Sequence, residues 1–344
     1  MRPKFVVVAA GYKYGTYVAD DALSILDQNG TRVDIDLRAL DIGARQAAFA
    51  SVAGDADAVV IAPWGGQGLE TIPDWLAAAP RVRVVAGTFD HRFGQISHHD
   101  VFGADRPVTV IDTSRTMTPT VAEFCLGMII NLLRDIPAHV ELMRTGGWTQ
   151  QWSDGNGFVG GDLTGRAVGL AGFGVLNRTL ADLLRPFRCT VSAFDPHVPL
   201  TGVRPAADLV SLAASSEIFV VGIPELPDTR EIIDRAVIAA LPVGALFVLP
   251  TRMAVAAQDA LWDRVKSGEI RAAIDVFAPE PPPTDAWFRT HPNVLATPHL
   301  AGNTAQAHRR CFHIACEQAV EALAGRPARH VLSEVDARVY GWRR

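Results

Sequence analysis

The sequence predicts an α/β protein with two doubly wound parallel sheets. Short apolar runs of strand length alternate with stretches of helical periodicity along the whole chain, a pattern that favours parallel sheets covered by helices on both faces. The chain has 344 residues, which is typical of about two domains. Near its middle, a strand, a glycine turn and a helix follow one another directly.

The first third of the chain predicts one of the two sheets. The apolar runs give expected strands at 5–10, 32–36, 58–62, 82–86 and 108–111, and helical spacing gives helices at 18–28, 45–53 and 71–79. The loops at 63–68 and 87–92 follow expected strands and are rich in glycine or polar residues. Such loops hold ligands in parallel sheets, but they are also where ordinary turns fall.

Residues 118–145 predict one long helix. Pro119 stands near its start and Gly146-Gly147 follows its end, as helix boundaries favour. The segment 125–133 is apolar almost all round, so we expect this helix to be buried and to join the two domains.

The glycine turn in the middle of the chain predicts a dinucleotide site. The strand 167–171 leads into Gly172 and Gly174, then into a helix. A second apolar run at 189–194 ends at Asp195, 23 residues beyond Gly172, about where a ribose-binding carboxylate belongs. An Asp there accepts hydrogen bonds from a ribose diol and repels a 2′-phosphate, which favours NAD over NADP.

One position of this turn departs from the expected pattern. The third position is normally Gly or Ala, so that helix and strand pack closely, and here it is Asn177. We expect Asn177 to loosen that packing or to shift the pyrophosphate. Two alternatives remain open: the segment is a crossover without a ligand, or Asp195 is only a turn residue before Pro196.

Three polar residues follow later strands, which are expected at 218–223, 245–249, 272–276 and 294–296, before a final amphipathic helix at 305–325. Arg252, Glu280 and His299 each come shortly after one of these runs. Reduction of a carbonyl needs a cation to polarise oxygen and a proton donor near neutral pH. An arginine fork, a histidine and a carboxylate that stabilises the imidazolium are chemically sufficient. Each residue alone also fits an ordinary structural role.

The composition narrows the classes of partner. A net charge of −5 gives no reason to expect nucleic acid or a membrane surface. Cys125, Cys189, Cys311 and Cys316 show no metal-ligand or disulfide spacing, so no metal site is predicted and a cytoplasmic location is expected. The apolar start is too short for a signal peptide, and we expect no membrane-spanning run.

The motifs resemble those of the D-isomer-specific 2-hydroxyacid dehydrogenase family over nearly the whole chain. The segments that carry the resemblance are 120–124, the glycine turn, 224–230, Thr251-Arg252, 275–281 and 297–302. The resemblance implies two Rossmann-like or flavodoxin-like α/β domains with a cleft between them, usually in a homodimer. It predicts a substrate domain of residues 1–114 plus 301–344 and an NAD-binding domain of residues 115–300.

The resemblance also implies a role for each matching residue. Arg252 would clamp the substrate carboxylate and polarise its C2 oxygen, with His299 as acid/base and Glu280 as the partner that raises the pKa of that histidine. Asp275 would receive the nicotinamide carboxamide. The other expected NAD-binding residues are Thr120, Gly172, Phe173, Gly174, Val175, Leu176, Asp195, Pro196, His197, Gly222, Ile223, Pro224, Thr229, Thr251 and Gly302. Backbone amides of Trp64, Gly65, Gly66, Gln67, Gly87, Thr88 and Phe89 would bind the substrate carboxylate.

Several departures from the family pattern bear on function. Val175 replaces a common arginine, and Leu249-Pro250 and Met253 change the surroundings of Arg252. The expected activity is interconversion of a small 2-hydroxy acid and a 2-oxo acid with NAD. One alternative is an NAD-binding protein with a non-catalytic recognition role. Another is a formate-type enzyme, which Glu280 disfavours because related formate dehydrogenases have Gln there.

Overall fold

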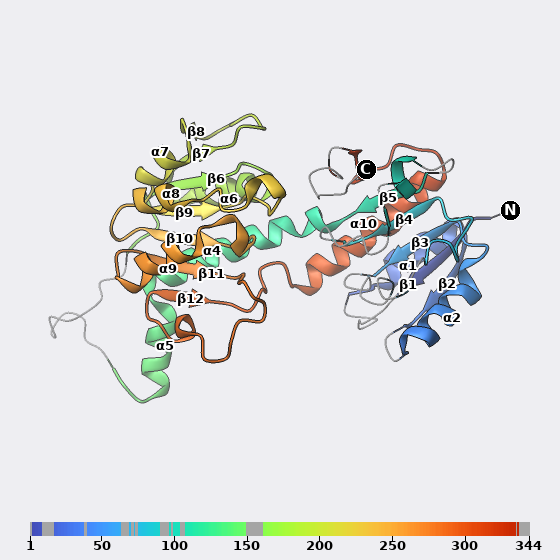
Figure 1. The fold of residues 1–344 in the computed structure, drawn as a ribbon, viewed down its shortest axis with the longest axis horizontal. Coiled ribbons are helices and arrows are strands. Elements are labelled where there is room, and N and C mark those ends of the chain that lie inside the picture. Colours follow the sequence, from blue (N-terminus) through green and yellow to red (C-terminus); the bar gives the residue numbers. More distant parts are fainter. Residues whose placement is uncertain are drawn as a thin grey trace. The chain divides into compact units, whose positions relative to one another are not determined.

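The computed structural model describes residues 2–8, 17–37, 40–62, 69, 72, 75–89, 96–97, 99–103, 107–148, 161–334 and 336. The chain divides into two compact units (Figure 1). Unit 1 is Met1–Met117 with Asn303–Arg344, and unit 2 is Thr118–Gly302. The sequence predicts these divisions a few residues earlier, after 114 and after 300.

Unit 1 contains a five-stranded parallel sheet in the order β2-β1-β3-β4-β5. Its strands are β1 (Lys4–Val8), β2 (Thr31–Ile35), β3 (Ala58–Ile61), β4 (Val84–Gly87) and β5 (Thr109–Asp112). The expected strands are therefore confirmed with small shifts at their ends, except that residues 9–10 lie outside the described part. The C-terminal segment returns to this sheet, where Val331 forms an antiparallel bridge with Ile111.

Helices cover both faces of this sheet. α1 (Asp20–Asn29) and α10 (Ala305–Leu323) pack on one face around Phe5, Leu26 and Phe312. α2 (Ile42–Ala53) packs on the other face, where Phe49 is fully buried. Of the helix expected at 71–79, residues 75–78 form a turn, and three of the other positions lie outside the described part.

Unit 2 contains a seven-stranded parallel sheet in the order β12-β11-β10-β9-β6-β7-β8. The strands are β6 (Ala167–Ala171), β7 (Thr190–Phe194), β8 (Arg204–Pro205), β9 (Ile218–Val221), β10 (Leu246–Leu249), β11 (Arg271–Ile274) and β12 (Val294–Ala296). The strand order reverses between β6 and β9. In open α/β sheets, ligands bind outside the carboxyl ends of the strands at such a switch point. The two-residue strand β8 is not predicted by the sequence.

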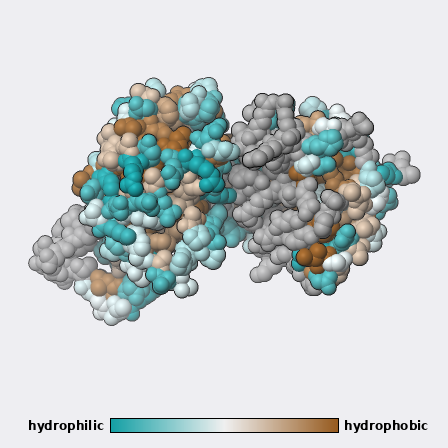
Figure 2. Space-filling model, in the orientation of Figure 1, coloured by the Kyte–Doolittle hydropathy of each residue, from teal (hydrophilic) through white to brown (hydrophobic). Residues whose placement is uncertain are grey.

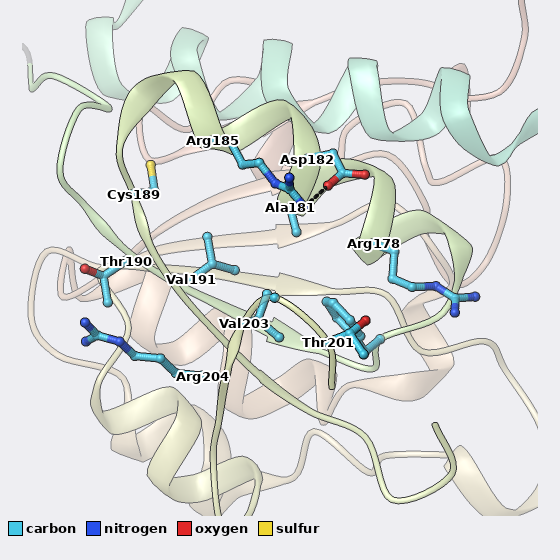
Figure 3. A pocket seen from close by; sticks show the side chains of 12 residues that line it. Arg178, Ala181, Asp182, Arg185, Cys189, Thr190, Val191, Thr201, Val203 and Arg204 are labelled. Carbon is cyan, nitrogen blue, oxygen red and sulfur yellow. Dashed lines mark ion pairs between the residues drawn. The ribbon is translucent and has the colours of Figure 1, made fainter. Parts of the chain in front are cut away.

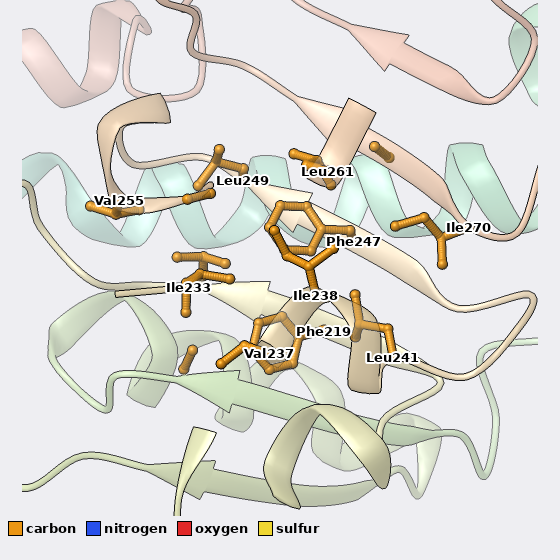
Figure 4. Packing of buried hydrophobic residues seen from close by; sticks show 14 of the residues in the cluster. Phe219, Ile233, Val237, Ile238, Leu241, Phe247, Leu249, Val255, Leu261 and Ile270 are labelled. Atoms are coloured by element: carbon orange, nitrogen blue, oxygen red, sulfur yellow. The ribbon is translucent and has the colours of Figure 1, made fainter. Parts of the chain in front are cut away.

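Two hydrophobic cores lie on the two faces of this sheet. α4 (Thr118–Arg134) and α6 (Val175–Leu184) cover one face. α7 (Leu209–Ala214), α8 (Arg235–Ala240) and α9 (Gln258–Lys266) cover the other. On that second face the rings of Phe219 and Phe247 stack at 6.0 Å, surrounded by aliphatic side chains (Figure 4). Both sheet faces are covered, which is why the strands are apolar at nearly every position.

The single helix expected at 118–145 is wrong: α4 ends at Arg134 and α5 (Ile136–Arg144) begins after Asp135. Asp135 takes a left-handed conformation with φ of 49°. Pro137 lies in the first turn of α5 and lacks the N–H that a continuous helix needs. Arg271 also donates to the carbonyl of Leu132 and to the Asp135 carboxylate, so the groups at this break are hydrogen-bonded.

The expectation that no run has the length of a membrane span also needs correction. Among the described residues, the helical stretch Ser114–Arg134 is long and apolar enough by length and composition alone. Its apolar side chains are accounted for by packing, because Cys125, Ile129 and Leu132 are buried in the core of unit 2. The stretch is therefore a core helix.

Candidate functional site

The glycine turn between β6 and α6 is shaped to receive a ligand at the helix N-terminus. Gly172 has a φ of +79°, which favours glycine, and a Cβ there would lie 3.0 Å from Ile223 and 3.3 Å from the Gly222 backbone. Gly174 precedes the first residue of α6, and no side chain caps this helix. No capping side chain therefore accepts hydrogen bonds from the backbone amides at the start of α6, as an anion site at a helix N-terminus requires.

Asp195 lies at the carboxyl end of β7 and is fixed by two backbone amides. Its Oδ2 accepts from the N–H of Phe173 at 2.7 Å, and its Oδ1 accepts from the N–H of His197 at 2.8 Å. Each carboxylate oxygen keeps further acceptor capacity. The structure therefore brings Asp195 to the glycine turn, in a fixed orientation with acceptors for a diol.

Asn177 is accommodated in the turn without loss of packing. Its side chain is fully buried, and its Nδ2 donates to the carbonyls of Ala171 and Gly172 at 3.1 and 2.7 Å. Space exists because Gly222, on the neighbouring strand end, has no side chain: a Cβ there would lie 2.4 Å from that Nδ2. Gly222, 45 residues away in the sequence, thus makes the space that lets the helix and the strand pack closely around Asn177.

The other expected cofactor residues lie at the ends of neighbouring elements. Gly222, Ile223 and Pro224 follow β9 directly. The hydroxyl of Thr229 donates to the Pro224 carbonyl at 2.6 Å, and that of Thr251 donates to the Val221 carbonyl at 3.3 Å. Four more lie elsewhere in unit 2: Thr120 in the first turn of α4, Pro196 and His197 after β7, and Gly302 at the last residue of the unit.

His299 and Glu280 are in direct contact. His299 Nδ1 lies 2.8 Å from Glu280 Oε2, and Glu280 Oε1 accepts from the N–H of Phe277 at 2.7 Å. Both side chains are about one-third exposed. The dyad therefore has one carboxylate oxygen held by the backbone and the other directed at the imidazole.

The charge on Glu280 is stabilised by its surroundings. Partial burial raises the pKa of Glu280, but the amide of Phe277, the His299 ring and the charge of Arg252 together hold that pKa below its ordinary value. Arg252 itself follows β10 and donates to the carbonyl of Thr251 at 2.7 Å. The three residues expected to act together thus come from the ends of three adjacent strands and are electrostatically coupled.

Asp275 is buried and holds the loop that carries His299. Its Oδ1 accepts from the Thr297 hydroxyl at 2.6 Å and the Leu300 amide at 2.9 Å, and its Oδ2 accepts from the Ala301 amide at 2.9 Å. The motif 297–302 indicates this segment in the sequence, and the structure adds the Thr297 hydroxyl as a donor to Asp275. The structural task of Asp275 is to order the turn around His299.

The expected substrate loops belong to unit 1 and are described only in part. Trp64, Gly65, Gly66 and Gln67 lie outside the described residues. Gly87 ends β4, and Thr88 and Phe89 follow it. The N–H of Phe89 donates to the buried Asp112 carboxylate at 3.2 Å, and the hydroxyls of Thr88 and Thr113 lie 3.1 Å apart. The amide of Phe89 is therefore already engaged within unit 1.

A separate pocket of about 590 Å³ lies between α6 and the strands β7 and β8 (Figure 3). It is lined by Phe173, Arg178, Ala181, Asp182, Arg185, Cys189, Thr190, Val191, Thr201, Gly202, Val203 and Arg204. Arg185 is paired with Asp182 at 2.7 Å. The guanidinium groups of Arg178 and Arg204 lie at opposite ends of the pocket. Phe173 is shared with the expected cofactor residues, and the catalytic candidates lie elsewhere.

The part of the chain that holds the glycine turn, Arg252, Glu280 and His299 matches a known protein family. Residues 126–301, or 176 of 344, match the model of the D-isomer specific 2-hydroxyacid dehydrogenase, NAD binding domain. A D-3-phosphoglycerate dehydrogenase of Methanocaldococcus jannaschii is 28% identical over 287 residues, which are 81% of this chain and 52% of that protein. A hydroxypyruvate reductase of Thermotoga maritima is 32% identical over 211 residues, 60% of this chain and 67% of that protein.

Solved structures match the fold over both units. A phosphoglycerate oxidoreductase from Rhizobium etli has a TM-score of 0.76 at 23% identity, covering 98% of this chain and all of the other. The chain spans about half the length of several of the curated relatives it matches, 52% and 47% in two of them.

Proposed function

Since this chain belongs to the D-isomer-specific 2-hydroxyacid dehydrogenase family, we propose that it is an NAD-dependent oxidoreductase acting on a small 2-hydroxy or 2-oxo acid. The observation that carries the proposal is the 2.8 Å contact between His299 and Glu280, with Arg252 at the end of the adjacent strand. A carbonyl reductase needs a proton donor and a cation on the same side of the substrate. These three residues supply both.

The residues around the glycine turn fit the cofactor. Gly172 and Gly174 leave the backbone accessible to a pyrophosphate at the N-terminus of α6. Asp195 offers acceptors to the adenosine ribose, and its charge opposes a 2′-phosphate. We therefore propose NAD rather than NADP, with Phe173, Val175 and Leu176 beside the pyrophosphate and Gly222 to Pro224 across the switch point.

The proposed chemistry assigns one task to each catalytic residue. Bound NADH supplies the hydride that reduces C2 of the 2-oxo acid. His299 donates a proton from Nε2 to the C2 oxygen, because its Nδ1 faces Glu280. Glu280 holds the imidazole in that orientation and stabilises its charged form. Arg252 stabilises the negative charge that develops on the C2 oxygen and orients the substrate carboxylate.

The substrate carboxylate needs donors besides Arg252. We propose that backbone amides of the loops 64–67 and 87–88 supply them from unit 1. The Phe89 amide was expected to join them, and its hydrogen bond to Asp112 makes it the weakest member of that set. Glyoxylate, pyruvate and hydroxypyruvate are suitable probes of a small 2-oxo acid site.

The second candidate function is an NAD-binding protein without catalysis. Asn177, Val175 and Leu249-Pro250 motivated it in the sequence. The hydrogen bonds of Asn177 within an ordered turn fit either function, whereas the intact His299–Glu280 contact favours the enzyme. A purely recognitive protein has no need for an ionised Glu280 directed at an imidazole.

Calorimetric titration with NADH, followed by NADH oxidation assays with the three probe acids, tests the proposal. We expect NADH to bind more tightly than NADPH and at least one acid to support continuous turnover. Binding without turnover on any 2-oxo acid would favour the non-catalytic alternative. Formate-dependent NADH production would instead favour the formate-type reaction.

We also propose a homodimer in the cytoplasm. The described residues of α5 include no buried side chain, and Ile136, Val140 and Met143 share one face while being 40%, 41% and 56% exposed. Hydrophobic surface is visible where Figure 1 places α5 (Figure 2). All four cysteines are free, which suits a reducing compartment.

A further inference from the structure

The inference concerns the peptide group that joins Gly172 to Phe173. Its carbonyl oxygen accepts from Asn177 Nδ2 at 2.7 Å. Its N–H donates to Asp195 Oδ2, also at 2.7 Å. One peptide is therefore held at both ends by side chains, and it links a residue of α6 to the carboxylate at the end of β7.

We propose that Asn177 is a positioning residue that acts through this peptide to orient Asp195 for the adenosine ribose. The proposal rests on the proposed NAD-binding function. Gly172 is the residue of the turn with the greatest freedom, at φ +79°. Fixing its carbonyl fixes the direction of the next N–H. A carbonyl that accepts a hydrogen bond also makes the N–H of the same peptide a stronger donor, because successive hydrogen bonds polarise one another.

The amide of Asn177 has one orientation that suits this site. The carbonyls of Ala171 and Gly172 only accept hydrogen bonds, so Nδ2 must face them. Oδ1 is then buried without a hydrogen-bond partner among the described residues. A buried unpaired acceptor lowers stability. Asn177 thus serves the turn at some cost to folding, which is expected of a residue with a functional task.

Gly222 completes the arrangement. A Cβ at this position would lie 2.4 Å from Asn177 Nδ2 and 2.6 Å from its Cγ. The Gly222 N–H donates to the Ala171 carbonyl at 2.8 Å, so the glycine and the asparagine share one acceptor. Asn177 and Gly222 form a matched pair across the switch point: the large residue on the helix requires the small one on the strand end.

The test is a double-mutant cycle read as dissociation constants for NADH and NADPH on the full chain. In Asn177→Ala, NADH binding should weaken by roughly five- to tenfold, the loss of about one net hydrogen bond. Binding of NADPH should change less, since Asp195 opposes its phosphate. In an Asp195→Ala background, adding Asn177→Ala should weaken NADH binding by less than about twofold.

The matched control is Asn293→Ala. Asn293 also donates from Nδ2 to a backbone carbonyl of unit 2, that of Val265 at 3.2 Å, away from the turn. The Asn293→Ala variant should leave the ratio of the dissociation constants for NADH and NADPH unchanged. Gly222→Ala provides a second variant in case Asn177→Ala does not fold. As a single change it should weaken NADH binding, and in the Asp195→Ala background it should add less than about twofold, whereas direct obstruction of the cofactor would weaken binding equally in both backgrounds.

The outcomes separate this inference from the proposed function. A wild-type chain that binds neither NADH nor NADPH overturns the proposed cofactor role, and this inference with it. A wild-type chain that binds NADH, with the same fold loss from Asn177→Ala in both Asp195 backgrounds, overturns the inference alone. An Asn177→Ala variant with unchanged affinity for NADH would also overturn the inference alone.

Discussion

His299 shows how the site depends on single residues. It has a φ of 54°, a left-handed conformation that a histidine adopts only when its surroundings impose it. Its N–H donates to the carbonyl of Asp275 at 2.9 Å, and the carboxylate of Asp275 accepts the amides of Leu300 and Ala301. These bonds offset the strain and place the imidazole at Glu280.

Replacing Glu280 by Gln should move the pH profile of reduction downward. Despite partial burial, the Phe277 amide, the His299 ring and the charge of Arg252 hold the pKa of Glu280 below its ordinary value, so the carboxylate is ionised in the neutral range. Gln removes the negative charge that stabilises protonated His299. The pH at which the rate of NADH-dependent reduction falls off should therefore decrease, and kcat should fall with little change in the NADH dissociation constant.

The control for this prediction is Glu225→Gln. Glu225 is also a partly exposed carboxylate of unit 2, but it pairs with Arg230 at 2.6 Å and not with a histidine. The rate of reduction by the Glu225→Gln variant should depend on pH in the same way as that of the wild type. A Glu280→Gln profile that coincides with the wild type over the whole range would show that the carboxylate does not influence the proton donor.

At the scale of residues, the identity of a side chain predicts its own role, but it does not predict which other residue makes space for it. Arg252, Glu280 and His299 were indicated by their chemistry and their places after strands. The fit of Asn177 was not, because the space for it depends on Gly222 in another strand. Sequence spacing carries no information about which side chain faces which across a sheet.

At the scale of elements, the prediction of the glycine turn is confirmed, and the prediction of one continuous helix is wrong because the chain breaks between α4 and α5. The strand β6 has the predicted bounds because its apolar run ends at a glycine with a positive φ. The division of 118–145 into α4 and α5 follows from Pro137, a signal present in the sequence. The partner that stabilises the break, Arg271, lies on a distant strand and was not predictable.

The burial of α4 predicts a large effect of core substitutions. Ile129 is fully buried in the core of unit 2, so Ile129→Ala should lower the free energy of unfolding of this unit by about 2–5 kcal/mol. Ile136, at the start of α5, is 40% exposed, and Ile136→Ala is the matched control. Urea unfolding followed by circular dichroism measures both. Equal midpoints for the two variants would mean that α4 is not part of the core.

At the scale of the whole molecule, the architecture was predictable but the substrate was not. Alternating apolar runs and helices predict two parallel sheets, and the switch point of unit 2 is where a sheet of this kind binds its ligand. The substrate depends on loops of unit 1, of which Gly87, Thr88 and Phe89 are described. In the proposed function the backbone donors of Gly87 and Thr88 would bind a carboxylate, a group that all 2-hydroxy acids share, whereas the Phe89 amide already donates to Asp112.

The exposed apolar face of α5 predicts an effect on assembly. Val140→Asp places a charge in the middle of that face, and burying it in a dimer interface is costly. We expect the wild type to sediment as a dimer and Val140→Asp as a monomer in analytical ultracentrifugation. Val243→Asp is the control, because Val243 is 79% exposed in the turn before β10 and belongs to no such face. A Val140→Asp dimer would place the interface elsewhere.

The most direct test of the central claim compares NADH-dependent reduction of a 2-oxo acid by the wild type, Arg252→Ala and His299→Ala. Removing a donor to a developing oxyanion costs roughly 3 kcal/mol or more of transition-state stabilisation. We predict that kcat/KM falls by about a hundredfold or more in each variant, while both still bind NADH. Undiminished kcat/KM in either variant would contradict the assignment of that residue, and in both would contradict the account of the site.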